Sequence, residues 1–327
     1  MPLKLTTYSQ SRDIPDLPGT CTFHSTELFR IYEATSGYTP LLVVASDDGK
    51  PLGKLLAVVQ RNRSLCPPLF IKRCEIFGTG EYADDVADKE VIFGEMLHQL
   101  TDRVLREAFV IEFRNLSNAL FGYKAFRRNH YFAVNWLRVY NSLHNLNRVE
   151  ERFSPSRIRQ IKKGLKNGAE VRAARSPEEV RNFAHILFKI YSSKIRRYFP
   201  NKEFFSHLTE QMMGSGQAGI FVVIYKEKII GGSACLYSDD TAYLWFSGGM
   251  RKTYLLQYPG VLAVWGALRD ARERGFRHLE FMDVGLPFRR HGYRDFVLRF
   301  GGKQVGTRRW FRFRWIWLNR LMNLLYK

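Results

Sequence analysis

The chain has 327 residues, about the size of two typical domains, which excludes a lone small module. Hydrophobic residues make up 45% and aromatic residues 14% of the sequence, enough to fill a sizeable core, so a wholly disordered chain is also excluded. Lys and Arg number 51 against 31 Asp and Glu, which gives a formal net charge of +20.

The positive charge is concentrated in two stretches. Residues 148–175 hold nine Lys and Arg and three Glu, and residues 289–327 hold eleven Lys and Arg and one Asp. Charge focused in this way indicates an anionic partner such as phosphate, nucleic acid or lipid headgroups. A basic surface without such a ligand is the alternative.

Metal sites, disulfides and membrane spans are not expected. The four Cys form no CxxC pair, and the eight His show no HxH, HxxxH or HExxH spacing, so we expect no metal. Residues 1–19 lack a hydrophobic signal segment, and no apolar run approaches 18 residues. These features predict a cytoplasmic protein.

In chain order, the first half begins with a predicted hairpin. Residues 41–46 and 55–60 are apolar, and Asp47-Asp48-Gly49-Lys50 between them predicts a tight turn. The apolar spacing from Phe93 to Leu105 predicts a helix. Further strands are expected at 75–79, 109–116 and 131–140.

The second half follows a polar connector at 141–153. Ser154-Pro155 predicts the start of a basic helix that ends at Gly168, and Ser176-Pro177-Glu178-Glu179 predicts a second helix through a capping box. The remaining expected elements are a short helix at 201–213, strands at 219–225, 228–237 and 241–249, a helix at 259–274, a strand at 277–285, a helix at 293–300, a strand at 303–314 and a terminal helix at 315–326.

The two halves repeat the same order of elements. Each runs from a hairpin through a strand and a helix to a buried strand, which reads IEF from Ile111 and LEF from Leu279. Each buried strand is followed by FRR, at Phe126 and at Phe288. The shared order predicts an internal duplication.

The second half resembles a known enzyme family. Its basic helix SRIRQIKKGLKNG, followed in order by QYPG, LEFMDVG and RFGG, is similar to the GNAT-fold acyltransferases related to the Fem peptidoglycan interpeptide-bridge enzymes, and in particular to the FemAB-like or BioF-like acetyltransferase domain. The first half is similar only in element order. The resemblance implies an α/β (α+β) fold of two tandem GNAT-like halves, 1–148 and 149–327, each a mixed twisted sheet flanked by helices.

The resemblance also implies a reaction. An acyl or aminoacyl group passes from an activated donor to an amine, such as a cell-envelope precursor, by direct attack and without a covalent enzyme intermediate. Two neighbouring parallel strands, here 243–248 and 278–284, are expected to part and to expose backbone donors between them. No permanently bound cofactor is expected, and the donor is acyl-CoA or aminoacyl-tRNA, two alternatives that the sequence leaves open.

Candidate catalytic residues lie after the LEFMD strand. Asp283 is placed to orient or deprotonate the amine, because carboxyl groups at strand ends face the crevice of open α/β sheets. His291 is a second candidate, since imidazole titrates near neutral pH.

Donor phosphate is expected where the helix at 259–274 begins and at a nearby arginine pair, because helix N-termini and guanidinium groups both bind phosphate. The residues are Gln257, Tyr258, Gly260, Arg289 and Arg290. Substrate contacts are expected at Tyr243, Trp245, Lys162, Lys163 and Phe296.

Two other interpretations remain open. A noncatalytic nucleic-acid-binding protein would use the basic stretches 148–175 and 289–327, although no helix-turn-helix, zinc-finger or RNP motif is present. The second alternative is a degenerate Fem-like scaffold at a membrane surface.

The C-terminal residues 308–327 mix Arg with Trp, Phe and Leu, and they either pack on the core or sit on an anionic bilayer. The expected partners are therefore a small-molecule or lipid-linked amine, with tRNA and an anionic membrane surface as further candidates. Peripheral attachment would place the protein at the inner membrane face.

Overall fold

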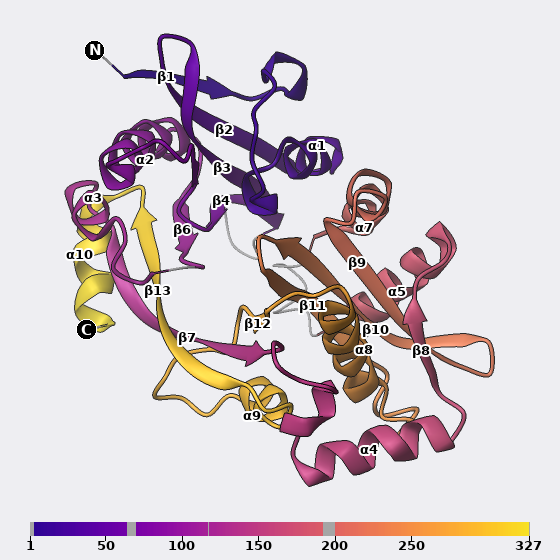
Figure 1. Cartoon of the computed structure of the whole chain (residues 1–327). Helices are drawn as coiled ribbons and strands as arrows, with labels where there is room; N and C mark the ends of the chain where they lie inside the picture. The colour runs from indigo at the N-terminus through magenta and orange to yellow at the C-terminus, as the bar shows by residue number, and fades with distance from the viewer. Residues whose placement is uncertain (1–2, 64–69, 117, 192–199, 327) are drawn as a thin grey trace. The chain divides into compact units, whose positions relative to one another are not determined.

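The computed structural model describes residues 3–63, 70–116, 118–191 and 200–326 (Figure 1). The chain forms two compact units. Unit 1 comprises Met1–Trp136 and Gly306–Lys327, and unit 2 comprises Leu137–Val305. This division differs from the predicted halves 1–148 and 149–327, because the last segment of the chain belongs to unit 1.

The sheet of unit 1 is antiparallel apart from one parallel pair, β4 with β6. Its strand order is β1-β2-β3-β4-β6-β13, and β5 pairs with β3. The strands are β1 (Lys4–Tyr8), β2 (Tyr38–Asp47), β3 (Lys50–Arg63), β4 (Phe70–Phe77), β5 (Glu81–Tyr82), β6 (Val110–Arg114) and β13 (Lys303–Phe313).

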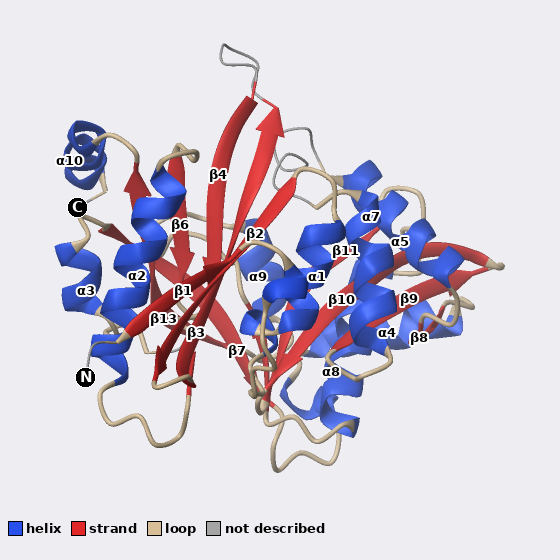
Figure 2. Ribbon diagram, turned by 90° about the horizontal axis from the view of Figure 1, so that it is seen from above, coloured by secondary structure: helices blue, strands red, loops and turns tan. Residues whose placement is uncertain are grey.

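Helices of unit 1 pack on this sheet (Figure 2). The predicted helix at 93–105 is the longer α2, whose residues Phe93, Met96 and Leu100 are fully buried. Trp310 of β13 is also fully buried and stacks on Phe126 at 4.5 Å. The helices are α1 (Thr26–Ala34), α2 (Lys89–Leu105), α3 (Tyr123–Arg128) and α10 (Ile316–Leu325), with short 3-10 turns η1 (Ser11–Asp13) and η2 (Thr22–His24).

The sheet of unit 2 has the order β7-β12-β11-β10-β9-β8. Among its described strands, β11 and β12 are the one parallel pair. The strands are β7 (Phe132–Ser142), β8 (Glu170–Ala173), β9 (Ala218–Tyr225), β10 (Lys228–Ser238), β11 (Thr241–Gly249) and β12 (His278–Phe281).

Helices cover both faces of this sheet. A Cβ on Gly249 would meet the start of α8, whereas a Cβ on its neighbour Gly248 would meet Ile190 of α5. Because successive residues of a strand point to opposite faces, α8 and α5 lie on opposite sides. The helices are α4 (Pro155–Lys166), α5 (Pro177–Ile190), α7 (Lys202–Leu208), α8 (Pro259–Glu273) and α9 (Gly292–Leu298), with a 3-10 turn η3 (Val149–Arg152) and a π turn η4 (Thr209–Met213).

The predicted helix starts at Ser154 and Ser176 are confirmed. Each hydroxyl accepts a hydrogen bond from the backbone N–H three residues on, at 3.4 Å and 3.3 Å. The capping box at Ser176 is only half formed, because the Glu179 carboxylate instead accepts from the N–H of Arg175 and pairs with Arg172.

The predicted hairpin, the long helices and the duplication are confirmed by the structure. The element orders β4-α2-β6-α3-β7 and β11-α8-β12-α9-β13 correspond one to one. The final strands are exchanged between the repeats, because β13 pairs with β6 and β7 pairs with β12. The elements β1, α1, α3 and the short strand β8 were not predicted from the sequence.

Candidate functional site

The pairing of the parallel strands β11 and β12 stops before β11 ends, as the resemblance to GNAT folds implies. Four residue pairs join them, from Thr241–His278 to Leu244–Phe281, where β12 ends. β11 continues to Gly249, still paired with β10. The pairing of β11 with β12 therefore ends at Leu244, whereas β11 itself runs on for five more residues; we call this point, where the two strands part, the opening.

Two tyrosine hydroxyls contact β11 at Ser247, beyond the last residue that pairs with β12. The hydroxyl of Tyr191 donates to the carbonyl oxygen of Ser247 at 2.7 Å, and the hydroxyl of Tyr293 lies 3.5 Å from the Ser247 hydroxyl. Burial raises the pKa of Tyr191 to about 12 and raises the pKa of Tyr293 further, where the nearby Asp283 charge adds to the shift. Both phenols are therefore neutral proton donors at physiological pH.

The start of α8 presses against the end of β11. A Cβ on Gly249 would lie 2.4 Å from the backbone nitrogen of Gly260, so only glycine allows this approach. Tyr258 has φ of 48°, a left-handed conformation that turns the chain into Pro259, the first residue of α8. The space where a Cβ of Gly260 would project is empty to 4 Å. The N-terminus of α8, with its partial positive charge, thus lies at the open end of the strands.

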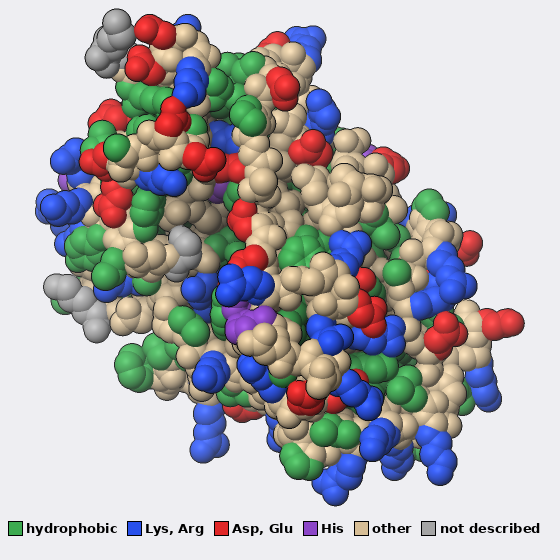
Figure 3. Space-filling view, viewed as in Figure 1, with side chains coloured by type: hydrophobic (Ala, Val, Ile, Leu, Met, Phe, Trp, Pro, Cys, Tyr) green, Lys and Arg blue, Asp and Glu red, His purple; other side chains and the backbone are tan. Residues whose placement is uncertain are grey.

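The segment around the start of α8 is cationic. Residues 250–269 contain no Asp or Glu, and Arg251 and Lys252 are exposed there. Helix α4 runs beside this segment: Asn167 donates to the Leu256 carbonyl at 2.9 Å, and a Cβ on Gly164 would lie 2.6 Å from the Gln257 carbonyl oxygen. Lys162 and Lys163 of α4 are exposed, and Lys and Arg side chains gather over α4 (Figure 3).

The loop after β12 brings together the predicted catalytic pair and the arginine pair. Asp283 is exposed, as are Arg289 and Arg290. The ring of His291 packs on Gly285, and its buried Nδ1 has no hydrogen-bond partner. These four predicted residues share one loop, at the same edge of the sheet as the start of α8.

Arg294 of α9 shapes this loop, and the sequence analysis missed it. The residue is 8% exposed, and its guanidinium donates to the carbonyl oxygens of Leu286 at 2.8 Å and Arg289 at 2.5 Å. A buried arginine facing backbone carbonyls leaves no sequence signal. Its bonds fix the path of the chain between Asp283 and His291.

Two of the predicted substrate residues, Trp245 and Phe296, make packing contacts, and a third, Tyr243, is placed by strand pairing. Trp245 meets Phe204 of α7 edge to face at 5.4 Å. Phe296 lies beneath the Arg157 guanidinium at 4.4 Å, and its carbonyl accepts from that guanidinium at 2.7 Å. Tyr243 stands in register with Glu280 across the parallel pair. These contacts place Tyr243 and Trp245 on β11 and Phe296 between α9 and α4.

Glu280 is a buried carboxyl that the sequence analysis also missed. It is 1% exposed, and it accepts a hydrogen bond from Arg138 at 2.9 Å while its other oxygen, Oε1, has no hydrogen-bond partner. Burial raises the pKa of Glu280 to about 7, and Arg138 only partly offsets this rise. The LEF motif predicted a buried strand at this position, but the sequence did not reveal that the Glu280 carboxyl itself is buried.

The equivalent region of unit 1 is closed. β4 and β6 pair to the last residue of both strands, Phe77 and Arg114, and the N–H of Gly78 still bonds the Arg114 carbonyl at 2.9 Å. The segment before α2, residues 81–90, carries five acidic residues and one Lys. Unit 1 therefore lacks both the separated strands and the cationic helix start.

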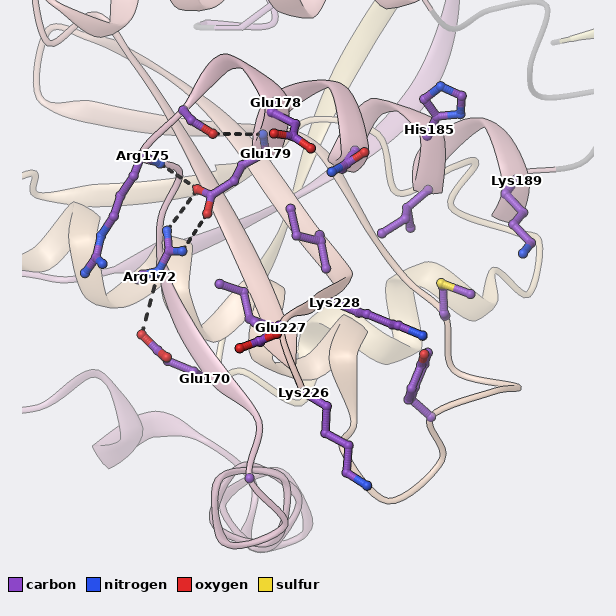
Figure 4. Close-up of a pocket in the computed structure, with 18 residues that line it drawn as sticks. Glu170, Arg172, Arg175, Glu178, Glu179, His185, Lys189, Lys226, Glu227 and Lys228 are labelled. Carbon is purple, nitrogen blue, oxygen red and sulfur yellow. Dashed lines mark hydrogen bonds and ion pairs between the residues drawn. The ribbon is translucent and has the colours of Figure 1, made fainter.

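A groove of about 1100 Å³ lies elsewhere in unit 2, between α5, β8 and the β9–β10 hairpin (Figure 4). It is lined by mixed charges, including the bonded Arg172–Glu179 pair, and by none of the predicted site residues.

Across the parts of the chain that the structure describes, no group of three His, Cys, Asp or Glu is arranged to hold a metal ion. Within the same residues, no helix is long and apolar enough to span a membrane.

Comparison with known proteins agrees with this geometry. Residues 155–312 match the family described as the acetyltransferase (GNAT) domain. The chain is similar to FemX, at 12% identity and a TM-score of 0.61 over 93% of this chain and 94% of that one. It is also similar to a tandem GNAT protein from the clavulanic acid biosynthesis pathway, at 9% identity and a TM-score of 0.58 over 96% and 99%.

A further similar structure is L-PGS from Bacillus licheniformis, at 11% identity and a TM-score of 0.51 over 83% of this chain and 86% of that one. A search of curated proteins found no significant match. Identities this low establish the fold alone.

The fold and the separated strands define an α/β protein with tandem GNAT folds. The domain match adds a class of activity for residues 155–312, slightly less than half of the chain: this part is similar to the acetyltransferase (GNAT) domain. The fold is similar to that of FemX.

Proposed function

We propose that unit 2 transfers an acyl group from acyl-CoA to an amine by direct attack, without a covalent enzyme intermediate. The observation that carries this proposal is the opening between β11 and β12 beside the start of α8. Such an opening holds a donor carbonyl next to its incoming nitrogen, and proximity of this kind supplies much of the rate of acyl transfer.

The donor phosphates bind at the start of α8. The Gly260 N–H and the helix dipole favour an anion there, and Arg251, Lys252, Arg289 and Arg290 supply exposed cations. The empty space beside Gly260 lets a phosphate approach the backbone closely. Gln257 and Tyr258 set the turn that aims the helix at this position.

The chemical step needs one base and one acid. Asp283, with His291 as the second candidate, accepts the proton of the attacking ammonium. The new C–N bond forms as the C–S bond breaks, and the neutral Tyr293 hydroxyl protonates the leaving thiolate. The nitrogen loses a second proton as the amide forms. One of the two nitrogen protons restores the phenol through solvent and the other is released to solvent, so the enzyme returns to its starting state.

A charged tRNA is the second candidate donor, favoured by the exposed basic face of α4 with Lys162 and Lys163. The proposed acceptor is a small-molecule or lipid-linked amine of the cell envelope, and the proposed location is the cytoplasm. Salt-sensitive RNA binding with no product formed would instead support the nucleic-acid-binding alternative.

The test begins with intact-mass analysis of ligands that co-purify with the protein. The protein is then incubated with acyl-CoA pools and amine acceptors, and free thiol is measured. Thiol release that depends on the amine supports the proposal. Release of deacylated tRNA from charged tRNA pools, without thiol release, would replace CoA by tRNA as the donor.

Variants then assign the roles. Tyr293→Phe should lower kcat roughly 100-fold with little change in donor KM, because it removes a proton donor without changing the cationic segment. Charge reversal at Arg289 and Arg290 should raise the donor KM with kcat largely kept. An Asp283→Asn variant with full turnover would remove Asp283 from the mechanism.

A further inference from the structure

The terminal helix α10 presents its polar side inward. Asn319 is 5% exposed, its Oδ1 accepts from the Phe313 N–H at 2.7 Å, and its Nδ2 donates to the Phe313 carbonyl at 3.3 Å. Among the large apolar side chains of residues 315–326, none is buried. An amide therefore fixes α10 to the end of β13, and the neighbouring Leu318 and Met322 are half-buried on this side of the helix.

The outward side of α10 is apolar. Trp317, Leu321 and Leu324 are 63%, 47% and 71% exposed, and their spacing of four and three residues places them on one face of the helix. Ile316 and Leu325 are exposed beside this stripe. Hydrophobic side chains lie at the surface where α10 lies (Figure 3). Single exposed apolar residues are ordinary, but a continuous stripe indicates a binding surface.

The charged residues of the segment that carries this stripe have a single sign. Residues 308–327 contain five Arg and one Lys and no Asp or Glu. Arg314 and Arg320 are exposed next to the apolar side chains. The partner must therefore accept leucine and tryptophan side chains and also carry negative charge.

We propose that α10 lies on the surface of an anionic lipid bilayer, with Trp317, Leu321 and Leu324 among the acyl chains and Arg314 and Arg320 at the headgroups. At ten residues α10 is about 15 Å long, so it lies in the plane of the bilayer instead of crossing it. This proposal is independent of the acyl-transfer proposal, since all residues of that site lie in unit 2.

Two other partners fit the surface less well. Two copies of α10 packed face to face would place Arg314 and Arg320 against their own equivalents, which like-charge repulsion opposes. An RNA would bind the arginines, but leucine side chains offer neither stacking nor hydrogen bonds to it. A bilayer satisfies both the apolar stripe and the cations.

The test uses the full-length protein in vesicle flotation. Vesicles of phosphatidylcholine that contain about 30% phosphatidylglycerol are compared with vesicles of pure phosphatidylcholine. We expect the fraction of protein that floats to be about 10-fold larger with the anionic vesicles. Leu321→Gln with Leu324→Gln should lower it by about 10-fold or more. The matched control is Val91→Gln with Leu120→Gln, two residues that are 58% and 62% exposed elsewhere in unit 1 and should leave flotation unchanged.

A second measurement, tryptophan fluorescence, does not depend on the two leucine substitutions. Trp317→Phe should keep flotation but lose part of the vesicle-induced blue shift of tryptophan fluorescence. Flotation unaffected by the leucine variant, or reduced equally by the control, would overturn the proposal. A wild-type dimer that becomes monomeric in the leucine variant, without vesicle binding, would show that the stripe joins two copies of the chain.

Discussion

Glu112 and Glu280 occupy equivalent positions in the two repeats but differ in ionisation. On the antiparallel neighbour of each glutamate, an arginine precedes the directly paired residue by two positions: Arg309 on β13 and Arg138 on β7. The guanidinium nitrogen lies 2.8 Å from the Glu112 carboxylate and 2.9 Å from the Glu280 carboxylate, respectively. Burial would raise the pKa of Glu112, yet three guanidinium groups, those of Arg309, Arg114 and Arg73, lower it to about 2. Glu280 has only Arg138, so burial dominates and its pKa rises to about 7.

The raised pKa of Glu280 predicts a pH dependence of stability. The folded state holds this proton more tightly than the unfolded chain, so the contribution of Glu280 is complete below pH 4.5 and is lost as the pH rises through about 7. Relative to Glu280→Gln, the wild-type free energy of unfolding should fall by about 2.5 kcal/mol between pH 5 and pH 8. Urea unfolding of both proteins at each pH measures this difference.

The loss of the Arg138 partner lowers the stability of the variant by a similar amount at each pH, so it cancels from this comparison. A difference that does not change with pH would show that Glu280 is ionised throughout the range.

At the scale of elements, the site depends on how closely α8 approaches β11. The approach needs glycine at Gly249, because a Cβ there would overlap the backbone at Gly260, whereas a Cβ on Gly260 would meet nothing within 4 Å. Unit 1 begins α2 differently: Asp88 caps the helix through the N–H of Val91 at 3.2 Å, and further acids precede it. A carboxylate at the start of a helix occupies the position that a phosphate would need.

This packing predicts opposite effects of two alanine substitutions. Gly249→Ala should lower the melting temperature by several degrees, because α8 must move away from the strand. Gly260→Ala should leave the melting temperature unchanged or raise it, yet increase the donor KM, because its methyl group fills the space proposed for phosphate. Thermal unfolding and donor titration separate the two, and an unchanged donor KM in Gly260→Ala would remove phosphate from that position.

At the scale of the whole molecule, the exchange of β7 and β13 explains why unit 1 is discontinuous. β13 supplies Arg309 and Trp310, both buried, to the core of unit 1, although it follows the helix α9 of unit 2. The predicted boundary at residue 148 followed the order of the repeats. Strand exchange depends on pairing between distant segments, which the order does not reveal.

The exchange predicts a selective effect of truncation. A chain ending at Val305 lacks the part of β13 that completes unit 1, while every residue of unit 2 remains. Hydrogen exchange should then show lost protection in β4 and β6 with protection kept in β9, β10 and β11. A chain ending at Phe313 keeps β13 and should protect both units. Equal loss of protection throughout the first variant would contradict the exchange.

Much of the fold was predictable because local signals agree with it. The Asp-Asp-Gly-Lys turn, the serine caps and the apolar spacing of Phe93 to Leu105 act over a few residues, and the structure keeps them all. The elements that were missed, such as β8, are short and acquire their structure from pairing with a longer neighbour, here β9.

The candidate site was predictable only in part. Asp283, His291 and the arginine pair share a loop whose position after a buried strand is visible in the sequence. Arg294 and Glu280 were missed because their significance comes from burial and from partners distant in the chain. Residue type alone does not distinguish a surface charge from a buried one.

The sequence by itself determined the order of elements, the duplication and the concentration of positive charge, since each depends on neighbouring residues. Only the tertiary structure decided where the pairing of β12 stops, and that β4 and β6 stay paired to their ends, because both depend on hydrogen bonds between distant segments. It also decided that α10 turns Leu321 and Leu324 outward, because Asn319 bonds the end of β13 and so sets the rotation of the helix.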